Sequence, residues 1–557
     1  MTHDRAGTIS QLFLDAGLLT PDQASAARTE AAGTGESFIR VLAALGYGTE
    51  EQFLKHLARL TGLDYLNLKD GAVSSAALEC MPLRFVSHYR MMPVDYRDGM
   101  LTVAVADPFD LAGFDDVRSL LGVELTRVLA SASDIAEAVS RYYGVGADTV
   151  TRMKQNIPPA ARAGKRAASE EETSEATSII TLVNQIISEA VRQEATDVHL
   201  EPLEDGLRAR YRIDGVLQDV SLPTAIASLY PSIVSRIKIM ANLNIAEQRL
   251  PQDGRIRTLQ NGKELDIRVS TMPLVTGEAV HLRLLRQHFF LGLEQLGYLS
   301  RDLAVLEAAI ARPHGIILVT GPTGNGKSTT LYACLAKIND PGRKIITVED
   351  PVEYRLKGVN QIQVQPKIGL TFAEGLRHIL RHDPDVLMVG EVRDSETAEI
   401  AIRAALTGHL VFSTLHTNDA AGTITRLLDM GFEPFLLSSS LVMTSAQRLC
   451  RRICTKCREP EDVPEALRQK LGLEPDVVVY HGRGCDACGK SGYKGREAVL
   501  EVLLLDDELK DMIVKRASEG EIASYARKNL QFRTLREDVM EKCLRGVTTV
   551  EEVFRVT

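Results

Sequence analysis

Hydrophobic and polar positions alternate along one short segment in the first half of the chain. Over residues 207–213, Leu, Ala, Tyr and Ile are separated by Arg208, Arg210 and Arg212. This period of two predicts a strand with one apolar face and one face that carries three arginines. A solvated polar face and a phosphate-facing surface both explain the arginines, and the pattern by itself favours the solvated face.

The first 147 residues carry helical and then mixed patterns. Residues 1–70 predict helices, with Thr20 and Thr49 as N-caps and a glutamine at the capping-box position after each. The similar segments 17–23 and 46–52 fit both an internal duplication and two helix starts that share capping chemistry. Residues 71–147 combine strand and helix signals, which predicts a small α/β module.

A segment without hydrophobic periodicity separates this region from the rest. Residues 148–177 contain two adjacent prolines, many alanines and a run of three glutamates. This composition predicts a flexible linker. Apolar periodicity resumes with a helical stretch at 179–193, and continuously apolar runs at 315–320 and 385–391 predict buried strands further on.

Length and composition are those of a multidomain globular protein. The 557 residues are 45% apolar and 25% charged, and the chain is too long for one hydrophobic core. A net charge of −9 argues against coating of nucleic acid by electrostatics. No apolar run approaches the ~18 residues of a membrane span, and the first residues lack a secretion signal. We expect a cytoplasmic protein that reaches a membrane through partners.

The clearest chemical motif lies between the strand at 315–320 and a helical stretch at 328–337. It fits the pattern G-x-x-x-x-G-K-[ST], whose backbone N–H groups cradle phosphates. Lys327 is expected to reach the β- and γ-phosphates, and Ser328 to hold Mg²⁺. The predicted nucleotide-binding residues of this loop are Gly321, Pro322, Thr323, Gly324, Asn325, Gly326, Lys327, Ser328 and Thr329.

Carboxylates and histidines follow the later apolar runs. The run at 385–391 ends in Glu391, which is expected to polarise the attacking water or support the magnesium shell. We expect this strand to lie directly beside the strand that precedes the phosphate loop. Glu349 and Asp350 end another strand, and His409 and His416 flank a third. Arg377 and Arg381 are four residues apart, which predicts that they share a helix face.

Two close cysteine pairs predict a structural zinc site. Cys454 and Cys457 form one C-x-x-C pair, Cys485 and Cys488 form the other, and 27 residues separate the pairs. Four thiolates complete a tetrahedral Zn²⁺ site and leave no open position for catalysis. The other four cysteines are scattered, and most are expected to be buried apolar residues.

The phosphate loop and the motifs after it resemble the type II/IV secretion ATPase superfamily. The segments at 346–353, 389–394 and 408–418 are similar to its Asp box, Walker B motif and His box, and segments at 197–201, 210–215 and 250–256 are similar to its preceding domain. The resemblance covers 178–557 in detail and the N-terminal region in general architecture. Ala279, where relatives often have Arg, and Asn325, where Ser is commoner, depart from the pattern without removing a catalytic group.

The resemblance implies a multidomain α/β protein whose RecA-like motor is preceded by a small α+β, PAS-like domain. The expected parts are a helical module at 1–70, an α/β adaptor at 71–147, a linker at 148–177, an α+β domain at 178–288, and an ATPase domain at 289–557 with C-terminal helices and a zinc insertion at 450–495. ATP would bind between the last two domains of a homo-hexamer. Glu391, Glu349, Lys327, Arg210 and Arg255 are then expected to be catalytic, and Asp350, His416, Arg268 and Arg283 to contact nucleotide.

The resemblance also implies a role at the inner membrane. We expect a motor that drives pseudopilus assembly and protein export in type II secretion, with type IV pilus extension as the alternative, bound to platform proteins through the N-terminal module. Residues 266–273 and 282–285 look more like the secretion branch. Cyclic di-GMP binders in the superfamily have a pattern that residues 8–10 and Ala31 do not match. A nucleic-acid motor is disfavoured because the chain lacks tryptophan and basic–aromatic interleaving.

Overall fold

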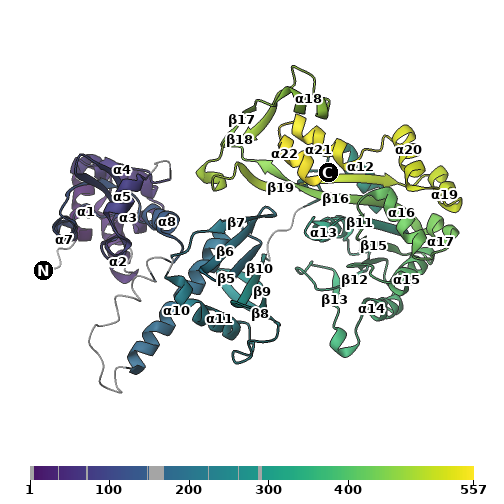
Figure 1. The fold of residues 1–557 in the computed structure, drawn as a ribbon, viewed down its shortest axis with the longest axis horizontal. Helices are drawn as coiled ribbons and strands as arrows, with labels where there is room; N and C mark the ends of the chain where they lie inside the picture. The colour runs from purple at the N-terminus through teal and green to yellow at the C-terminus, as the bar shows by residue number, and fades with distance from the viewer. Residues whose placement is uncertain are drawn as a thin grey trace. The chain divides into compact units, whose positions relative to one another are not determined.

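The computed structural model describes residues 5–34, 37–69, 73–146, 149, 168–223, 225–260, 262–286 and 292–557 (Figure 1). The chain divides into two compact units. The first comprises residues 1–261 and 266–284, and the second comprises residues 262–265 and 285–557. Among the residues that the structure describes, none of the helices combines the length and the apolar character needed to span a bilayer.

The first unit begins with four helices and a small sheet. The helices are α1 (Arg5–Asp15), α2 (Pro21–Thr34), α3 (Phe38–Ala44) and α4 (Glu50–Thr61). The sheet has the order β1-β4-β3-β2, formed by Asp64–Tyr65, Glu124–Leu129, Met100–Val105 and Met92–Arg97. Around it lie α5 (Ser75–Cys80), α6 (Leu83–Tyr89), α7 (Leu111–Leu121) and α8 (Ala132–Tyr143). Helical and sheet residues share one hydrophobic core.

Both predicted N-caps are confirmed. The backbone N–H of Thr20 donates to the Gln23 side chain at 2.9 Å, and that of Gln23 donates to the Thr20 hydroxyl at 3.3 Å. Thr49 and Gln52 make the same reciprocal pair at 3.0 and 3.2 Å. Each box satisfies two N–H groups that the first turn of a helix leaves without a partner.

The predicted linker is helical at its end. Residues 147, 148 and 150–167 lie outside the described residues, whereas α10 (Ala168–Arg192) includes the last ten residues of the segment 148–177. The prediction of a flexible linker is therefore wrong for residues 168–177. The polar composition of this segment did not indicate a helix. Helix propensity, unlike packing, needs no apolar period, so a polar segment can still be helical.

An antiparallel sheet packs on α10. Its order is β7-β6-β5-β10-β9-β8, formed by Val216–Val220, Gly206–Ile213, Asp197–Leu203, Gly277–Arg286, Lys263–Leu274 and Gln252–Gln260, with α11 (Ile226–Met240) beside it. The alternation predicted over 207–213 is present. Ala209 and Tyr211 are buried, and the Tyr211 hydroxyl donates to Ile186 O of α10 at 2.8 Å.

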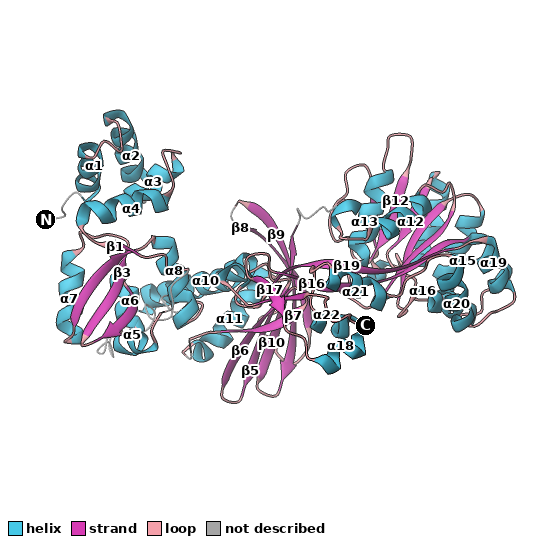
Figure 2. Ribbon diagram, turned by 90° about the horizontal axis from the view of Figure 1, so that it is seen from above, coloured by secondary structure: helices cyan, strands magenta, loops and turns pink. Residues whose placement is uncertain are grey.

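The second unit is built on a seven-stranded sheet (Figure 2). Its order is β13-β12-β14-β15-β11-β16-β19, formed by Asn360–Gln363, Ile345–Glu349, Val386–Val389, Leu410–Leu415, Gly315–Thr320, Leu441–Ile453 and Tyr493–Leu504. Strand β15 lies between β14 and β11, so the expectation that the Glu391 strand adjoins the phosphate-loop strand is wrong. An apolar run shows that a strand is buried but carries no information about its neighbours.

Helices cover both faces of this sheet. They are α12 (Ser300–Ile310), α13 (Lys327–Ile338), α14 (Phe372–Ile379), α15 (Ser395–Leu406), α16 (Ala420–Asp429), α17 (Pro434–Ser440), α19 (Asp507–Val514), α20 (Glu519–Asn529), α21 (Leu535–Leu544) and α22 (Val550–Val556). Short 3₁₀ turns are η1 (Leu293–Gln295), η2 (Pro366–Ile368), η3 (Leu380–His382) and η4 (Asp486–Cys488). Successive strand residues alternate between two core clusters, as in Val411 and Phe412.

Candidate nucleotide and zinc sites

The phosphate loop joins β11 to α13. Strand β11 is buried throughout, and α13 begins at Lys327. Gly321, Gly324 and Gly326 have φ values of 139°, 82° and 77°, which side chains disfavour. A Cβ on Gly321 would also lie 2.4 Å from Gln447 O of β16. The loop therefore needs glycine both for its path and for its close approach to the neighbouring strand.

Lys327 lies folded onto this loop. Its ammonium group donates to Gly321 O at 2.6 Å and to Pro322 O at 3.1 Å. Burial lowers the pKa of Lys327, the charge of Glu391 opposes that shift, and the charge of Arg448 adds to it. The charge of Glu391 therefore acts on Lys327. The next residue, Ser328, is exposed in the first turn of α13, where its hydroxyl can reach a magnesium ion.

A buried polar network, which the sequence analysis did not identify, supports the loop. Gln447 is 1% exposed, and its side-chain amide donates to Asn325 O at 2.7 Å. The side-chain oxygen of Gln447, Oε1, accepts from the hydroxyls of Thr330 at 2.7 Å and Tyr298 at 3.1 Å. The Asn325 side chain accepts from Leu449 N at 3.1 Å. Asn325 therefore ties the phosphate loop to β16. Gln447 could not be predicted as its partner, because no spacing rule links a loop residue to a glutamine so far along the chain.

Glu391 follows β14 and lies among cations. His416, which follows β15, places its Nε2 3.2 Å from Glu391 Oε2. Arg393 pairs with the same carboxylate and lies 3.8 Å from Asp350 Oδ2. Burial alone would raise the pKa of Glu391, but hydrogen bonds from Arg393 and His416 hold it below the ordinary value. The structure thus brings Glu391, Asp350 and His416 together.

Glu349 has a different environment at the end of β12. Its carboxylate is 4% exposed and accepts from the Thr347 hydroxyl at 2.5 Å, the Gln361 amide at 3.0 Å and the Tyr332 hydroxyl. Burial raises the pKa of Glu349, and these hydrogen bonds only partly offset that shift. Glu349 and Glu391 therefore have pKa values displaced in opposite directions.

The prediction that Arg377 and Arg381 share a helix face is wrong. Helix α14 ends at Ile379, and Arg381 lies in the 3₁₀ turn η3. Arg377 pairs with Glu374 and Glu396, while Arg381 donates to Arg377 O at 3.2 Å. Asp383, with φ of 52°, ends the turn in a left-handed conformation that the spacing of the two arginines does not reveal.

The arginines predicted to reach nucleotide belong to the first unit, and three of them pair with carboxylates of that unit. Arg210 donates to both oxygens of Glu201, at 2.9 and 2.7 Å. Arg255 pairs with Asp266, and Arg283 donates to Asp197 at 2.9 Å. Arg268 also has an interaction partner. These ion pairs orient the guanidinium groups within the sheet to which they belong.

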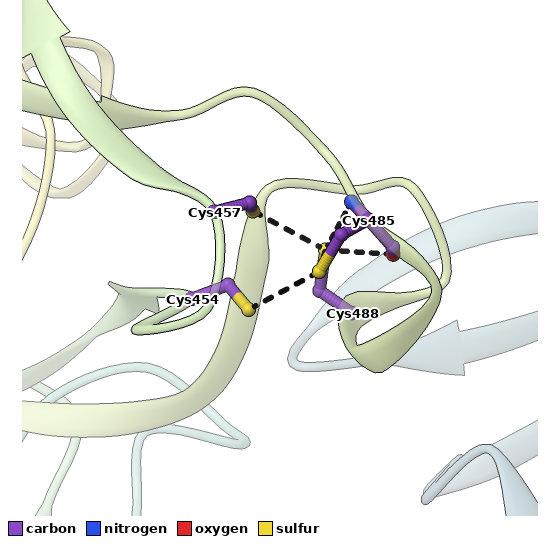
Figure 3. Close-up of side chains that lie close together, drawn as sticks. All are labelled: Cys454, Cys457, Cys485 and Cys488. Atoms are coloured by element: carbon purple, nitrogen blue, oxygen red, sulfur yellow. Dashed lines mark hydrogen bonds between the residues drawn. The ribbon is translucent and has the colours of Figure 1, made fainter. Parts of the chain in front are cut away.

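The four cysteines predicted to bind zinc lie together (Figure 3). Their sulfurs are 3.8 Å apart for Cys454 and Cys485, 3.9 Å for Cys457 and Cys488, and 3.8 Å for Cys485 and Cys488. A tetrahedron with Zn–S bonds of about 2.3 Å has sulfurs about 3.8 Å apart. The donor set and its spacing therefore fit Zn²⁺, and all four positions are filled by sulfur.

Backbone groups around the cysteines favour thiolates. The N–H groups of Cys485 and Gly492 donate to Cys488 Sγ at 3.2 and 3.3 Å. Burial raises the pKa of Cys488, but these bonds outweigh burial and lower it to about 7. A Cβ on Gly482 would lie 2.0 Å from Gly492 O, so glycine lets the two segments that flank the second knuckle approach each other.

The zinc insertion packs on the C-terminal helices. It contains β17 (Arg458–Glu461), α18 (Glu465–Leu471) and β18 (Val479–Gly482). Val463 and Val479 share a core cluster with Val539 of α21 and Val553 of α22. Of the four scattered cysteines, Cys334, Cys450 and Cys543 are buried as predicted, while Cys80 is partly exposed.

Comparisons with known proteins agree with the motifs. Residues 172–555 match the family model described as Type II/IV secretion system protein, and residues 61–149 match the MshEN domain. The chain is 43% identical over 543 residues to Type II secretion system protein E of Xanthomonas campestris, with 95% of each chain covered. It is 41% identical over 569 residues to Type IV pilus assembly ATPase PilB of Myxococcus xanthus, with 98% of each covered.

A solved structure supports the fold. The X-ray structure of the Legionella pneumophila ATPase DotB superposes with a TM-score of 0.51 at 21% identity, covering 68% of this chain and 95% of that one. At this identity the likeness concerns the fold alone. The predicted class, a multidomain α/β protein with a RecA-like domain, is confirmed.

Proposed function

Because the chain belongs to the type II/IV secretion system protein family, whose secretion and pilus relatives include ATPases, we propose that it is a hexameric motor that hydrolyses ATP to drive pseudopilus assembly and protein export. The observation that carries this proposal is the placement of Lys327 after β11 and of Glu391 after β14, because both strands pair in parallel with β15 and so end at the same edge of the seven-stranded sheet. A phosphate-binding cation and a water-polarising carboxylate are the two groups that hydrolysis of a γ-phosphate needs.

The residues of the site divide the work of binding and chemistry. On ATP binding, Lys327 exchanges its two carbonyl acceptors for β- and γ-phosphate oxygens, and residues 321–329 donate backbone N–H groups. Ser328 would hold Mg²⁺, which neutralises charge on the phosphates. Asp350 and His416 orient the groups around Glu391 through Arg393 and a direct contact.

The two glutamates suit different parts of the proton transfer. Glu391, with its lowered pKa, remains ionised and can polarise water without itself being protonated at rest. Glu349, with its raised pKa, accepts a proton more readily than Glu391 does. We assign both as catalytic, with Glu391 closest to the attacking water.

Arginines of the domain before the motor complete the site when a ring closes. Arg210, Arg255 and Arg283 are held by carboxylates of the sheet in which they lie, and Arg268 lies in the same sheet. A triphosphate that approaches this sheet would compete with those carboxylates for the guanidinium groups, and charge stabilisation would follow only after closure. Hydrolysis would thereby depend on domain motion, as a motor requires.

We place the protein in the cytoplasm, bound to inner-membrane platform proteins through its N-terminal module. Relatives from both branches match nearly the whole chain, and residues 266–273 and 282–285 favour secretion over pilus extension. The four-cysteine cluster serves as a structural Zn²⁺ site. Restoring secretion, but not piliation, in strains that lack each ATPase would support the secretion branch, and the converse would support the pilus alternative.

A nucleic-acid motor is the competing function. Its main support is a run of basic residues near the cysteines, namely Arg448, Arg451, Arg452, Lys456 and Arg458. Arg451 is held by Glu552 at 2.8 Å and lies 3.8 Å from the Tyr493 ring centroid, and Arg452 pairs with Glu497 at 3.4 Å. These side chains are committed to structural contacts. ATP turnover measured with DNA, with RNA, and with anionic lipid plus the cognate membrane protein separates the two functions, and stimulation by nucleic acid alone would overturn our assignment.

A further inference from the structure

Arg448 extends from β16 to the phosphate loop and to the loop after β15. Its Nη1 donates to Gln447 O at 3.1 Å, and its Nη2 donates to Asn418 O at 3.0 Å. A Cβ built on Gly321 would lie 3.1 Å from the same Nη1, so the guanidinium group packs against the first glycine of the loop. One side chain from the middle of β16 therefore touches the loops that follow two other strands of the sheet, β11 and β15.

The charge of Arg448 is not matched by a carboxylate at hydrogen-bond distance in the described part of the chain. Both acceptors of Arg448 are main-chain carbonyls, as are those of Lys327. Asp419 and Glu501, the acidic groups whose charges act on Arg448, have other partners: the Asp419 side chain caps α16, and Glu501 accepts from Ala420 N at 2.8 Å. Lys327 and Arg448, two cations beside Gly321, are thus hydrogen-bonded to neutral acceptors.

Asn418 connects this arginine to the catalytic carboxylate. It lies two residues after His416, whose ring contacts Glu391. His416 and Asn418 are themselves exposed, so packing does little to fix this loop. A hydrogen bond from a planar guanidinium group to Asn418 O supplies a fixed attachment that burial does not.

We propose that Arg448 is a positioning residue of the ATP site that holds the loop carrying His416 against the phosphate loop and keeps His416 on Glu391. Its charge also adds to that of Lys327 at Gly321, where phosphate binds. This inference rests on the proposed function. Under this inference the ATPase domain supplies its own arginine, Arg448, to the ATP site, in addition to the arginines of the preceding domain.

The test compares substitutions that separate charge from geometry. Arg448→Lys keeps the charge but loses the planar fork that reaches two carbonyls, so we expect kcat to fall about tenfold while the Kd for ATP changes less than about threefold. Arg448→Met should lower kcat similarly and also weaken ATP binding, because the positive charge is lost. Arg452→Lys on the same strand is the matched control and should leave both constants unchanged, since Arg452 is exposed and pairs with Glu497.

Chemical rescue distinguishes positioning from simple folding support. Millimolar methylguanidinium should restore part of the turnover of Arg448→Ala but none of that of Lys327→Ala. Wild-type kcat in Arg448→Lys would overturn the inference, as would a parallel loss of kcat, ATP affinity and thermal stability without rescue. If wild-type turnover did not require Lys327 at all, the proposed function itself would fail, which is a separate result.

Discussion

Glu391 and His416 face each other across the ends of two adjacent strands, with 3.2 Å between Glu391 Oε2 and His416 Nε2. Strands β14 and β15 pair in parallel, so the residues that follow them emerge at the same edge of the sheet. The contact places an imidazole nitrogen beside the carboxylate that we propose polarises water. Together with Arg393, it keeps Glu391 ionised in the acidic range.

This contact predicts the acid side of the pH–activity profile. The pKa of Glu391 is held below its ordinary value of 4.5, so activity should persist as pH falls until Glu391 is protonated. His416→Ala removes one of the two stabilising donors, which raises the pKa of Glu391 and moves the acid limb of kcat to higher pH. His409→Ala, at the opposite end of β15, is the control. An unshifted limb in His416→Ala would contradict the assignment of Glu391.

Removal of the arginines before the motor should slow turnover. We expect Arg210→Ala and Arg255→Ala each to lower kcat by about 10³-fold or more with a smaller change in ATP binding, as for other arginine fingers. Arg208→Ala is the matched control, because Arg208 lies on the same strand, is exposed and pairs with Asp219. Wild-type turnover in both variants would reject Arg210 and Arg255 as arginine fingers and leave Arg268 and Arg283 as the candidates for that role.

Mixing experiments test whether these arginines act between subunits. Mixed rings of Arg210→Ala and Lys327→Ala protein contain some intact composite sites, so partial activity should return. Absence of activity in rings shown to be mixed would reject the between-subunit version.

Loss of zinc should unfold the insertion before it affects the phosphate loop. Protein purified without chelator should contain about one zinc per chain, and Cys485→Ser should lose both the metal and thermal stability, because structural zinc contributes folding free energy. Cys80→Ser, outside the cluster, should retain both. Elemental analysis that finds no zinc in the wild-type protein would refute the metal assignment.

Deletion of residues 1–147 should separate recruitment from catalysis. The remaining chain keeps the antiparallel sheet and the whole ATPase sheet, so basal ATP hydrolysis should survive. Stimulation by the membrane complex should disappear if the N-terminal module is the adaptor. Normal recruitment and stimulation of the truncated protein would show that the adaptor lies elsewhere.

Local chemistry was predictable from the sequence, and spatial order was not. The capping pairs at Thr20 and Thr49, the alternation over 207–213 and the cysteine knuckles depend on residues close together in the chain or on fixed ligand geometry. The insertion of β15 between β14 and β11 depends on long-range pairing, which an apolar run does not encode.

The support of the phosphate loop was missed for the same reason. Gln447 and Arg448 reach the loop from a strand more than a hundred residues later, and neither belongs to a spacing pattern. The role of a buried glutamine, or of an arginine bonded to carbonyls, can be assigned only from the groups that surround it in the fold. Such residues become visible once the sheet order is known.

The most direct test of the account is single-turnover and steady-state ATP hydrolysis by Lys327→Ala and Glu391→Gln beside two controls. Lys337→Ala and Glu399→Gln are matched in residue type, and Lys337 lies at the exposed end of the same helix as Lys327. We predict that Lys327→Ala loses nucleotide binding or turnover, that Glu391→Gln retains bound ATP with little hydrolysis, and that both controls match the wild type. Near-normal hydrolysis in Lys327→Ala and Glu391→Gln would contradict the site.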